Sequence, residues 1–338
     1  MPIPCDRPWK RRAKSLARTL LHRAGGLRGV RYWNRQGFRI LMYHGFPSIP
    51  GMQEALAKQC EHMMRHYRIL SLTEIGRYVR EGRRPPPNAL AVTVDDGNQN
   101  FFLNGYPVFH AHQIPVTVFL VSGFLDRQLW LWWDQIRYVL EKTSRTSFPM
   151  SLSPGRPPVT FTLETDEQRQ QAIATITEAV KTLSQAERHR VLNEGLFRLL
   201  DVELPNEPPR HMAPMQWSEV RQIAKNGVDV GAHTVSHPML SRVQDHRELV
   251  REIVDSKRRI EEEVHRPVAH FCYPYGHRED FNEETLNVLE ECHFQTAVTT
   301  QHGLNFRETH PFLLNRLSVD AMFPEFYFQE RLAGLHSG

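Results

Sequence analysis

The stretch Ala-Leu-Ala-Val-Thr-Val-Asp-Asp-Gly at residues 89–97 decides the fold. Its first six residues are almost continuously apolar or β-branched, which predicts a strand buried on both faces, as in a parallel sheet. The strand stops at two adjacent carboxylates, Asp95 and Asp96, followed by the turn-forming Gly97. Because ligands of α/β folds bind at the carboxyl ends of strands, we expect functional residues at this point.

Six further runs of the same kind predict strands, at residues 38–43, 116–121, 228–232, 268–272, 296–299 and 312–319. Helical patterns lie between most of them. Ser71 and Glu74 form a capping box, residues 216–226 end at Gly227, and residues 245–264 form a long amphipathic pattern with many i,i+4 charge pairs. Alternating strands and helices predict either a parallel α/β barrel or a doubly wound sheet.

Composition excludes several classes of protein. The chain has 338 residues, of which 40% are hydrophobic and 24% charged, so wholesale disorder is excluded. The longest mostly apolar stretch, residues 114–125, is shorter than the roughly 20 residues of a membrane helix. Four widely spaced cysteines argue against a disulfide framework and a cysteine zinc site, and no apolar signal-peptide run follows the basic N-terminus. We expect a cytoplasmic protein.

The positive charge is concentrated at the N-terminus. Residues 1–40 hold eleven Lys or Arg and one Asp, while the whole chain has a net charge of only +4. Apolar residues recur there at helical spacing, which favours peripheral contact with an anionic membrane at the inner membrane face. Nucleic acid is the competing partner and is not expected. The simplest alternative is a solvated leader that packs on the domain.

One region breaks the alternation. Residues 126–211 are rich in Pro, Gln, Ser and Arg, with a helical stretch near 167–192. We therefore expect a largely helical insertion between the third and fourth strands. The predicted organisation is a basic leader at 1–36, a barrel in two parts at 37–125 and 212–322, the insertion between them, and a C-terminal tail at 323–338.

A second polar cluster follows the predicted strand at 228–232. His233 and His237 lie four residues apart, a spacing that on one helical turn would point both imidazoles at a single ion. Pro238 then places the pair in a strand-to-helix loop, on the same rim as the two aspartates. Two imidazoles and one carboxylate are the ligand set of a catalytic zinc with open positions, and the second carboxylate is left free to act as a base.

Two further strand ends carry polar or aromatic groups. Tyr273, Pro274 and Tyr275 precede Gly276 in a sharp turn whose amides could face a developing oxyanion and whose tyrosines could line a sugar-sized site. His44 ends the first strand at that rim. A plain structural turn is the alternative reading of both segments.

The ordered set TVDDG, HTVSH and YPYG, each after a strand, resembles the NodB-homology polysaccharide deacetylases of carbohydrate esterase family four over residues 40–320. The resemblance implies a distorted (β/α)7 barrel that hydrolyses N-acetyl groups on amino-sugar saccharides with a divalent metal, usually Zn²⁺. It makes Asp95 the general base and Asp96, His233 and His237 the metal ligands. Spacing alone does not decide which aspartate binds the metal. The Tyr275 amide would help to hold the oxyanion, and Pro274 and Tyr273 would contact substrate.

The chain departs from the family pattern at two positions. Cys272 stands where the family often has an arginine that orients the catalytic aspartate, and the last strand lacks the Leu-x-His motif that supplies the acid. Arg316 is a candidate replacement for the arginine and a substrate contact, and an ordinary salt bridge is its alternative role. His44 is the candidate acid, because histidine side chains ordinarily titrate near neutral pH; His310 should lie at the opposite end of the barrel. In the aromatic cluster Trp130, Trp132 and Trp133, Trp133 is the candidate to stack on a sugar ring; packing of the insertion against the barrel is the alternative role of the cluster.

Other functions fit parts of this pattern. Two histidines and one carboxylate also form the iron site of non-haem oxygenases, although those occur on antiparallel β folds. A metal-dependent glycosyltransferase would leave both histidines unexplained. A catalytically silent carbohydrate-binding relative and a hydrolase of small non-peptide amides are the remaining alternatives. We expect a deacetylase acting on a saccharide, polymeric or lipid-linked, in envelope or exopolysaccharide synthesis.

Overall fold

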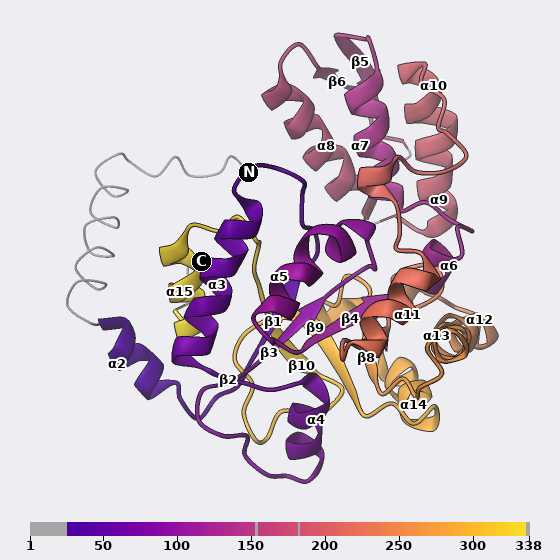
Figure 1. Ribbon diagram of the computed structural model, residues 1–338. Helices are drawn as coiled ribbons and strands as arrows, with labels where there is room; N and C mark the ends of the chain where they lie inside the picture. Colours follow the sequence, from indigo (N-terminus) through magenta and orange to yellow (C-terminus); the bar gives the residue numbers. More distant parts are fainter. Residues whose placement is uncertain (1–25, 153–154, 182, 336–338) are drawn as a thin grey trace.

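Seven parallel strands close into a barrel in the computed structural model, which describes residues 26–152, 155–181 and 183–335 (Figure 1). Around the ring the order is β1, β10, β9, β8, β7, β4, β3 and back to β1. All seven strands were predicted from the sequence. Their bounds are Arg39–Tyr43 (β1), Ala89–Val94 (β3), Val116–Leu120 (β4), Asp229–Ala232 (β7), His270–Cys272 (β8), Thr296–His302 (β9) and Leu314–Ser318 (β10).

The barrel is distorted at two places and extended at a third. β7 and β8 share a single register pair, Ala232 with Phe271, and the pairing of β10 with β9 shifts register between Leu314 and Arg316. A two-residue strand that the sequence did not reveal, β2 (Arg68–Ile69), pairs with the first residues of β3. The fold is thus the distorted (β/α)7 barrel that the family resemblance implied, and not a doubly wound sheet.

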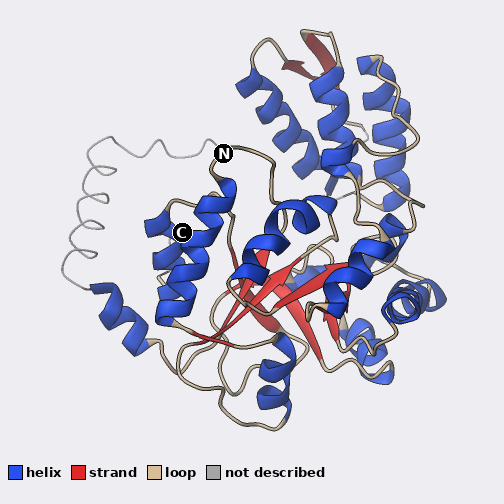
Figure 2. Ribbon diagram, in the orientation of Figure 1, coloured by secondary structure: helices blue, strands red, loops and turns tan. Residues whose placement is uncertain are grey.

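Helices cover the outside of the barrel, so the red strands of Figure 2 lie within a ring of blue helices. The capping boxes at Ser71 and Gln216 are both present, and the amphipathic pattern at 245–264 is one continuous helix with a π-helical turn in its middle. The helices are α3 (Met52–His66), α4 (Leu72–Arg80), α5 (Tyr106–Ala111), α6 (Ser122–Leu125), α11 (Trp217–Lys225), α12 (His246–Val250), α13 (Ser256–Val264), α14 (Glu283–Glu291) and α15 (Glu325–Ala333).

Alternation along the buried strands creates two apolar layers. On β3, Leu90, Val92 and Val94 belong to the large core beneath the outer helices, whereas Ala89 and Ala91 belong to the smaller core inside the barrel. Side chains alternate between the two faces of a strand, so Thr93 and Asp95 point into the barrel on the same side as Ala89 and Ala91. The inner core is small because a barrel of seven strands leaves room for few side chains.

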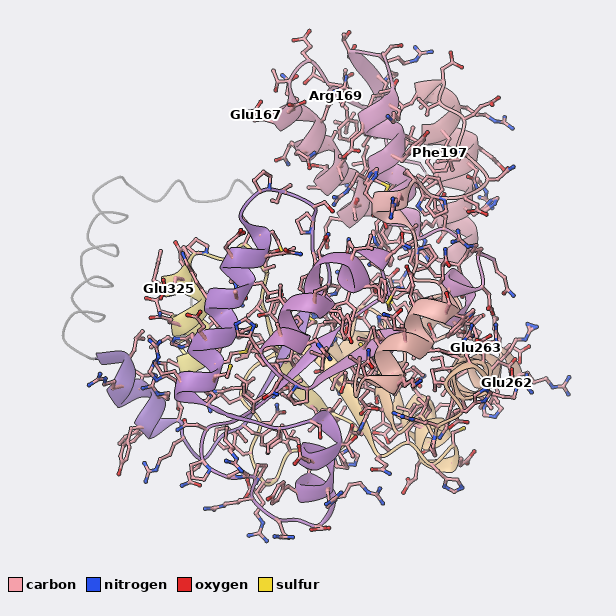
Figure 3. All side chains as sticks on the ribbon, in the orientation of Figure 1. Glu167, Arg169, Phe197, Glu262, Glu263 and Glu325 are labelled. Atoms are coloured by element: carbon pink, nitrogen blue, oxygen red, sulfur yellow. The ribbon has the colours of Figure 1, made fainter. Side chains whose placement is uncertain are left out.

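Within residues 126–211, the elements from α7 to α10 form a body beside the barrel with its own apolar core (Figure 1). Figure 3 labels Glu167 and Arg169 on α8 and Phe197 at the start of α10 within this body. Its elements are α7 (Trp132–Lys142), β5 (Ser147–Met150), β6 (Val159–Thr162), α8 (Asp166–Lys181), α9 (Gln185–His189) and α10 (Phe197–Leu200). The antiparallel β5–β6 hairpin was not expected, because Pro149 suggested a loop. The boundaries of this segment as an insertion stay a prediction.

The N-terminal helix that the sequence predicts within residues 1–25 lies outside the described residues. The described chain begins with α2 (Gly26–Trp33), which packs near α15. No described helix combines the length and the apolar character that a membrane span requires.

Candidate metal site at the rim of the barrel

Asp95 lies at the carboxyl end of β3 and points into the barrel, where it meets Arg316 of β10. The guanidinium donates to both carboxylate oxygens, Nη1 to Oδ1 and Nη2 to Oδ2, each at 2.7 Å. Both side chains are buried, and Arg316 also donates to the Thr93 hydroxyl and the Thr299 carbonyl. This two-bonded ion pair fixes the orientation of the carboxylate.

The electrostatics of this pair keep Asp95 ionised. Burial alone would raise its pKa, but the positive charge and hydrogen bonds of Arg316 outweigh burial and hold the pKa of Asp95 well below its usual range. Cys272 lies beside the pair, with its Sγ 3.1 Å from Arg316 Nη2 and 3.5 Å from Asp95 Oδ2. Burial raises the pKa of the Cys272 thiol, so it remains a neutral structural group.

Asp96 turns away from Asp95 because the backbone changes direction directly after β3. Asp96 has φ 74° and Gly97 has φ 82°, both in the left-handed region. A Cβ at Gly97 would lie 2.9 Å from the side chains of Leu120 and Leu125, so only glycine fits there. The turn therefore assigns the two carboxylates to different neighbours, which the sequence could not do.

His233 and His237 converge on Asp96 through a bent loop after β7. The pair lies in the strand-to-helix loop that the sequence predicted, but not on a helical turn: the loop contains left-handed residues, Thr234 with φ 67° and His237 with φ 58°. The Thr234 hydroxyl accepts from the His237 amide at 2.9 Å. Glu252 of the long helix holds the loop from outside, since its carboxylate accepts from the amides of Val235 and Ser236. The histidines meet because the loop curls, and not because of helical periodicity.

Asp96, His233 and His237 form a group whose potential ligand atoms all lie within 4.8 Å of one another. Nε2 of His233 is 3.6 Å and Nε2 of His237 is 3.9 Å from Asp96 Oδ1. The other ring nitrogen of His233, Nδ1, lies 2.8 Å from the Cys272 carbonyl, the kind of outer contact that orients a metal-binding imidazole. The residues present thus fit a divalent cation.

Further features of the histidines agree with this fit. Burial and the neighbouring His233 lower the pKa of His237 to about 3, so its ring is neutral and keeps a free lone pair. Its Nδ1 atom is buried without a hydrogen-bond partner among the described residues.

A second group, Asp95, His233 and Cys272, also has its potential ligand atoms within 4.8 Å of one another. It is a poorer metal site, because both oxygens of Asp95 already accept from Arg316.

A cavity of about 410 Å³ opens over these residues and contains the predicted acid. His44, at the end of β1, lines the cavity and is half exposed, with Nε2 3.7 Å from Asp95 Oδ2. His310 lies in a different pocket, beside His293 and Phe294. His44 thus lies at the rim where it was expected, and His310 lies away from the cavity; the role of His44 as the acid stays a prediction.

The turn after β8 brings Tyr275 to the cavity, with φ 61°. Gly276, with φ 72°, is required because a Cβ there would lie 2.7 Å from the Thr300 amide. The Tyr275 hydroxyl is 3.1 Å from Trp132 Nε1 and 3.3 Å from Arg188 Nη1, and each nitrogen donates to it. Its own amide donates to no protein group in the described part of the chain, and is therefore available to a ligand.

The structure corrects two of the predicted substrate contacts, Arg316 and Pro274. Arg316 is fully buried beneath Asp95 and does not line the cavity. Tyr273 does belong to the cavity lining, but its ring is buried, stacked on Phe281 with ring centroids 3.9 Å apart, and its hydroxyl donates to a backbone carbonyl. Pro274 is buried and shapes the turn. These residues support the site from behind.

Trp133 is a predicted substrate contact that reaches the cavity from outside the barrel. It lies on α7, and its ring meets the His237 ring edge to face at a centroid distance of 4.9 Å. The body at 126–211 also supplies Asp134, Arg137, Thr177 and Lys181 to the cavity wall. Sequence reasoning missed these four, because isolated polar residues on a helix have no motif; only the adjacent tryptophans marked the segment.

The comparisons with known proteins agree with the motifs. Residues 204–297 match the family model described as polysaccharide deacetylase. A putative polysaccharide deacetylase of Bacillus subtilis, YxkH, is 28% identical over 109 residues, which cover 32% of this chain and 38% of that protein. The alignment therefore spans less than half of this curated relative.

Two solved structures share the fold. The deacetylase PplD of Streptococcus pyogenes, solved with acetate, gives a TM-score of 0.56 at 16% identity over 88% of this chain and 96% of that one. IcaB of Ammonifex degensii gives 0.56 at 16% identity over 89% and 98%. At these identities the likeness concerns the fold.

Proposed function

We propose a function from the premise that this chain contains a polysaccharide deacetylase domain of the NodB-homology type: it hydrolyses N-acetyl groups on an amino-sugar-containing saccharide, with a divalent metal. The observation that carries the proposal is the Asp96, His233 and His237 group beside the Asp95–Arg316 pair, at the floor of one cavity. The same neighbourhood holds a candidate ligand set, a candidate base and a candidate acid.

Zn²⁺ is the metal we propose. Two imidazole nitrogens and one carboxylate oxygen, with further positions open, are the ligand set of catalytic zinc sites. Asp96, His233 and His237 would hold the ion, and the Cys272 carbonyl would keep His233 in the orientation that it needs. A bound divalent ion supplies Lewis acidity to the amide carbonyl and to the attacking water.

The protein residues divide the proton transfers. Asp95 takes a proton from the water that attacks the acetyl carbon, and Arg316 holds the carboxylate ionised and oriented for this step. The Tyr275 amide donates to the oxyanion as charge develops. His44 then gives a proton to the departing amine as the carbon–nitrogen bond breaks. The products are acetate and a free amino sugar.

An acetate-release assay on the purified, zinc-loaded chain tests this proposal. Acetylated chitooligosaccharides serve as substrate, and Asp95→Asn is the matched control, because it removes the base while leaving the proposed ligands. We expect acetate release by the wild-type chain and a loss of about 100-fold or more in the variant. Saccharide binding without acetate release from several acetylated saccharides would favour the silent, carbohydrate-binding alternative.

We further propose a cytoplasmic location with peripheral contact at an anionic membrane, in envelope or exopolysaccharide synthesis on a lipid-linked sugar. The described support is α2, which carries Arg28 and Arg31 together with two strongly exposed aromatic rings, Tyr32 at 63% and Trp33 at 85% exposure. Cationic and aromatic side chains on one short segment suit the headgroup region of a membrane.

Vesicle sedimentation tests this contact. The full chain should sediment with vesicles containing anionic phosphatidylglycerol, and deletion of residues 1–36 should abolish sedimentation while acetate release from a soluble substrate continues. The variant Trp33→Ala should weaken sedimentation, whereas Val159→Ala, at an exposed position on β6, should not. Unchanged sedimentation of the truncated chain would reject the contact.

A further inference from the structure

One part of the cavity wall comes from the body at 126–211 and is rich in cations. Arg137 lies on α7, and Lys181 ends α8. Both line the same cavity as the candidate metal ligands, together with the Thr177 side chain. This wall takes no part in the hydrolysis proposed above, so its composition needs a separate explanation.

The cations of this wall have no carboxylate partner in the part of the chain that the structure describes. Among the described residues no acid lies within 4.0 Å of the charged group of Arg137 or Lys181; Lys181 Nζ lies 5.8 Å from the centre of the Tyr275 ring. The Thr177 hydroxyl oxygen is buried and has no hydrogen-bond partner in the described part of the chain. By contrast, Arg169, also on α8, donates to the Leu140 carbonyl. Arg137, Lys181 and the Thr177 hydroxyl thus face the cavity without an ion-pair or hydrogen-bond partner among the described residues.

A third cation lies directly behind the wall. Arg188 is buried, stacks over the Trp132 ring at 4.8 Å, and donates to the Tyr275 hydroxyl. It too has no carboxylate within ion-pair distance among the described residues. Burying an arginine without a counter-ion is unfavourable unless nearby negative charge offsets it. This part of the cavity therefore carries an excess of positive charge.

Two acids lie near these cations, Asp280 near Lys181 and Asp134 near Arg137, but they cancel only part of that excess because burial raises the pKa of both. Asp134 lines the cavity, and burial, together with the charge of Asp96, raises its pKa to about 7 despite the nearby Arg137. Close to neutral pH its carboxyl group is therefore protonated for much of the time. A neutral carboxyl group donates a hydrogen bond, so it can contact an anion that a carboxylate would repel.

We propose that this wall binds an anionic group, phosphate or carboxylate, carried by the saccharide next to the acetylated sugar, so that the substrate is an anionic saccharide. This inference rests on the proposed function only for the hydrolysis of the acetyl group; the binding of an anion by the wall is argued independently of that reaction. Arg137 and Lys181 bind the anion directly, Thr177 donates its hydroxyl, and Arg188 adds charge from behind. Arginine and lysine side chains are the usual ligands of both groups in proteins.

Titration calorimetry on the zinc-loaded full chain tests the proposal with three probes. N-acetylglucosamine 1-phosphate carries a phosphate, a hyaluronan tetrasaccharide carries carboxylates, and tetra-N-acetylchitotetraose is neutral. The test variant is Arg137→Gln with Lys181→Gln. The matched control is Lys142→Gln, an exposed cation on α7 that lies outside the cavity.

We expect one anionic probe to bind at least about 10-fold more tightly than the neutral one, and the double variant to lose this preference while it binds the neutral probe as before. The probe that shows the preference identifies the anion as phosphate or carboxylate. The Lys142→Gln control should keep the wild-type preference. If Lys142→Gln lowered the preference as much as the double variant does, the preference would come from general surface charge and not from the wall, and the proposal would be overturned.

Two other outcomes would overturn the proposal. One is equal affinity for all three probes in the wild-type chain. The other is a preference that survives in the double variant, because phosphate held by the metal alone would persist there. Acetate release is measured separately: binding that follows these expectations without acetate release would reject the proposed function and keep the anionic saccharide as ligand. Acetate release without any preference for an anionic probe would keep the proposed function and reject the anionic saccharide as ligand.

Discussion

The rim of the barrel and the wall from residues 126–211 face the same cavity but are built differently. On the rim, Asp95 is held by Arg316 through two hydrogen bonds, and the His233 ring is fixed by the Cys272 carbonyl. On the wall, Arg137, Lys181 and the Thr177 hydroxyl have no such partners among the described residues. Groups held in one orientation suit chemistry, since geometry is set before substrate binds. Unpaired groups suit ligand recognition, because a bound ligand can supply the hydrogen-bond and ion-pair partners that they lack.

The largest expected effect comes from the metal ligands of the rim. His233→Ala removes one of three ligands, so zinc content should fall to a small fraction of the wild-type value and turnover should drop by about 1000-fold or more. Elemental analysis after dialysis measures the metal. His246→Ala, an exposed histidine paired with Glu284 outside the site, is the control and should retain the metal. Equal zinc content in His233→Ala and the wild-type chain would show that these residues do not form the metal site.

The next effect concerns proton donation from the rim. His44→Ala should keep metal and fold but lower kcat by about 100-fold, the usual scale for loss of a general acid. Circular dichroism and zinc analysis check the fold and the metal. His310→Ala is the matched control, because that histidine lies in another pocket. Near wild-type turnover in His44→Ala together with an inactive His310→Ala protein would reverse the assignment.

A smaller effect is expected from a substitution that keeps the positive charge beside Asp95 but removes the two-bonded geometry of the ion pair. Arg316→Lys preserves the positive charge beside Asp95 but not the two parallel bonds, so kcat should fall about 10-fold with little change in KM. Arg39→Lys is the control, since Arg39 is equally buried but donates only to backbone carbonyls. Both variants should lower the melting temperature, and a similar loss of kcat in both would assign the effect to stability alone.

The smallest effect concerns the wall and depends on pH. Because the pKa of Asp134 is raised to about 7, the native chain holds this proton more tightly than the unfolded chain, whose carboxyl groups titrate near 4. Stability therefore falls as the pH rises from about 4 through about 7, where Asp134 must ionise in a partly buried place. Asp134→Asn removes this penalty.

Thermal melts at pH 5 and pH 8 measure the difference. The melting temperature of Asp134→Asn relative to the wild-type chain should rise between the two pH values by a few degrees. Asp201→Asn, at an exposed position in the same segment, controls for the loss of one negative charge. A difference between Asp134→Asn and the wild-type chain that is the same at both pH values would contradict the raised pKa.

Local sequence predicted the parts of this molecule whose signals are local. The strands β1, β3 and β4 are nearly continuous apolar runs, a pattern typical of parallel strands that are buried on both faces. The motif after residue 94 marked the rim, because a parallel barrel puts every strand's carboxyl end on one side. Short or atypical elements escaped: β2 has two residues, and Pro149 lies inside β5.

The roles of individual side chains were decided only by tertiary structure. Asp95 and Asp96 are adjacent and chemically identical, and the sequence alone left their roles open. The left-handed turn at Asp96 and the inward position of Arg316, 221 residues away along the chain, separate them. Asp134 and Lys181 have no sequence signal at all, since a polar residue on a helix becomes functional only when packing turns it toward a cavity. Strand propensity acts between neighbours along the chain, whereas charge and burial act between neighbours in space.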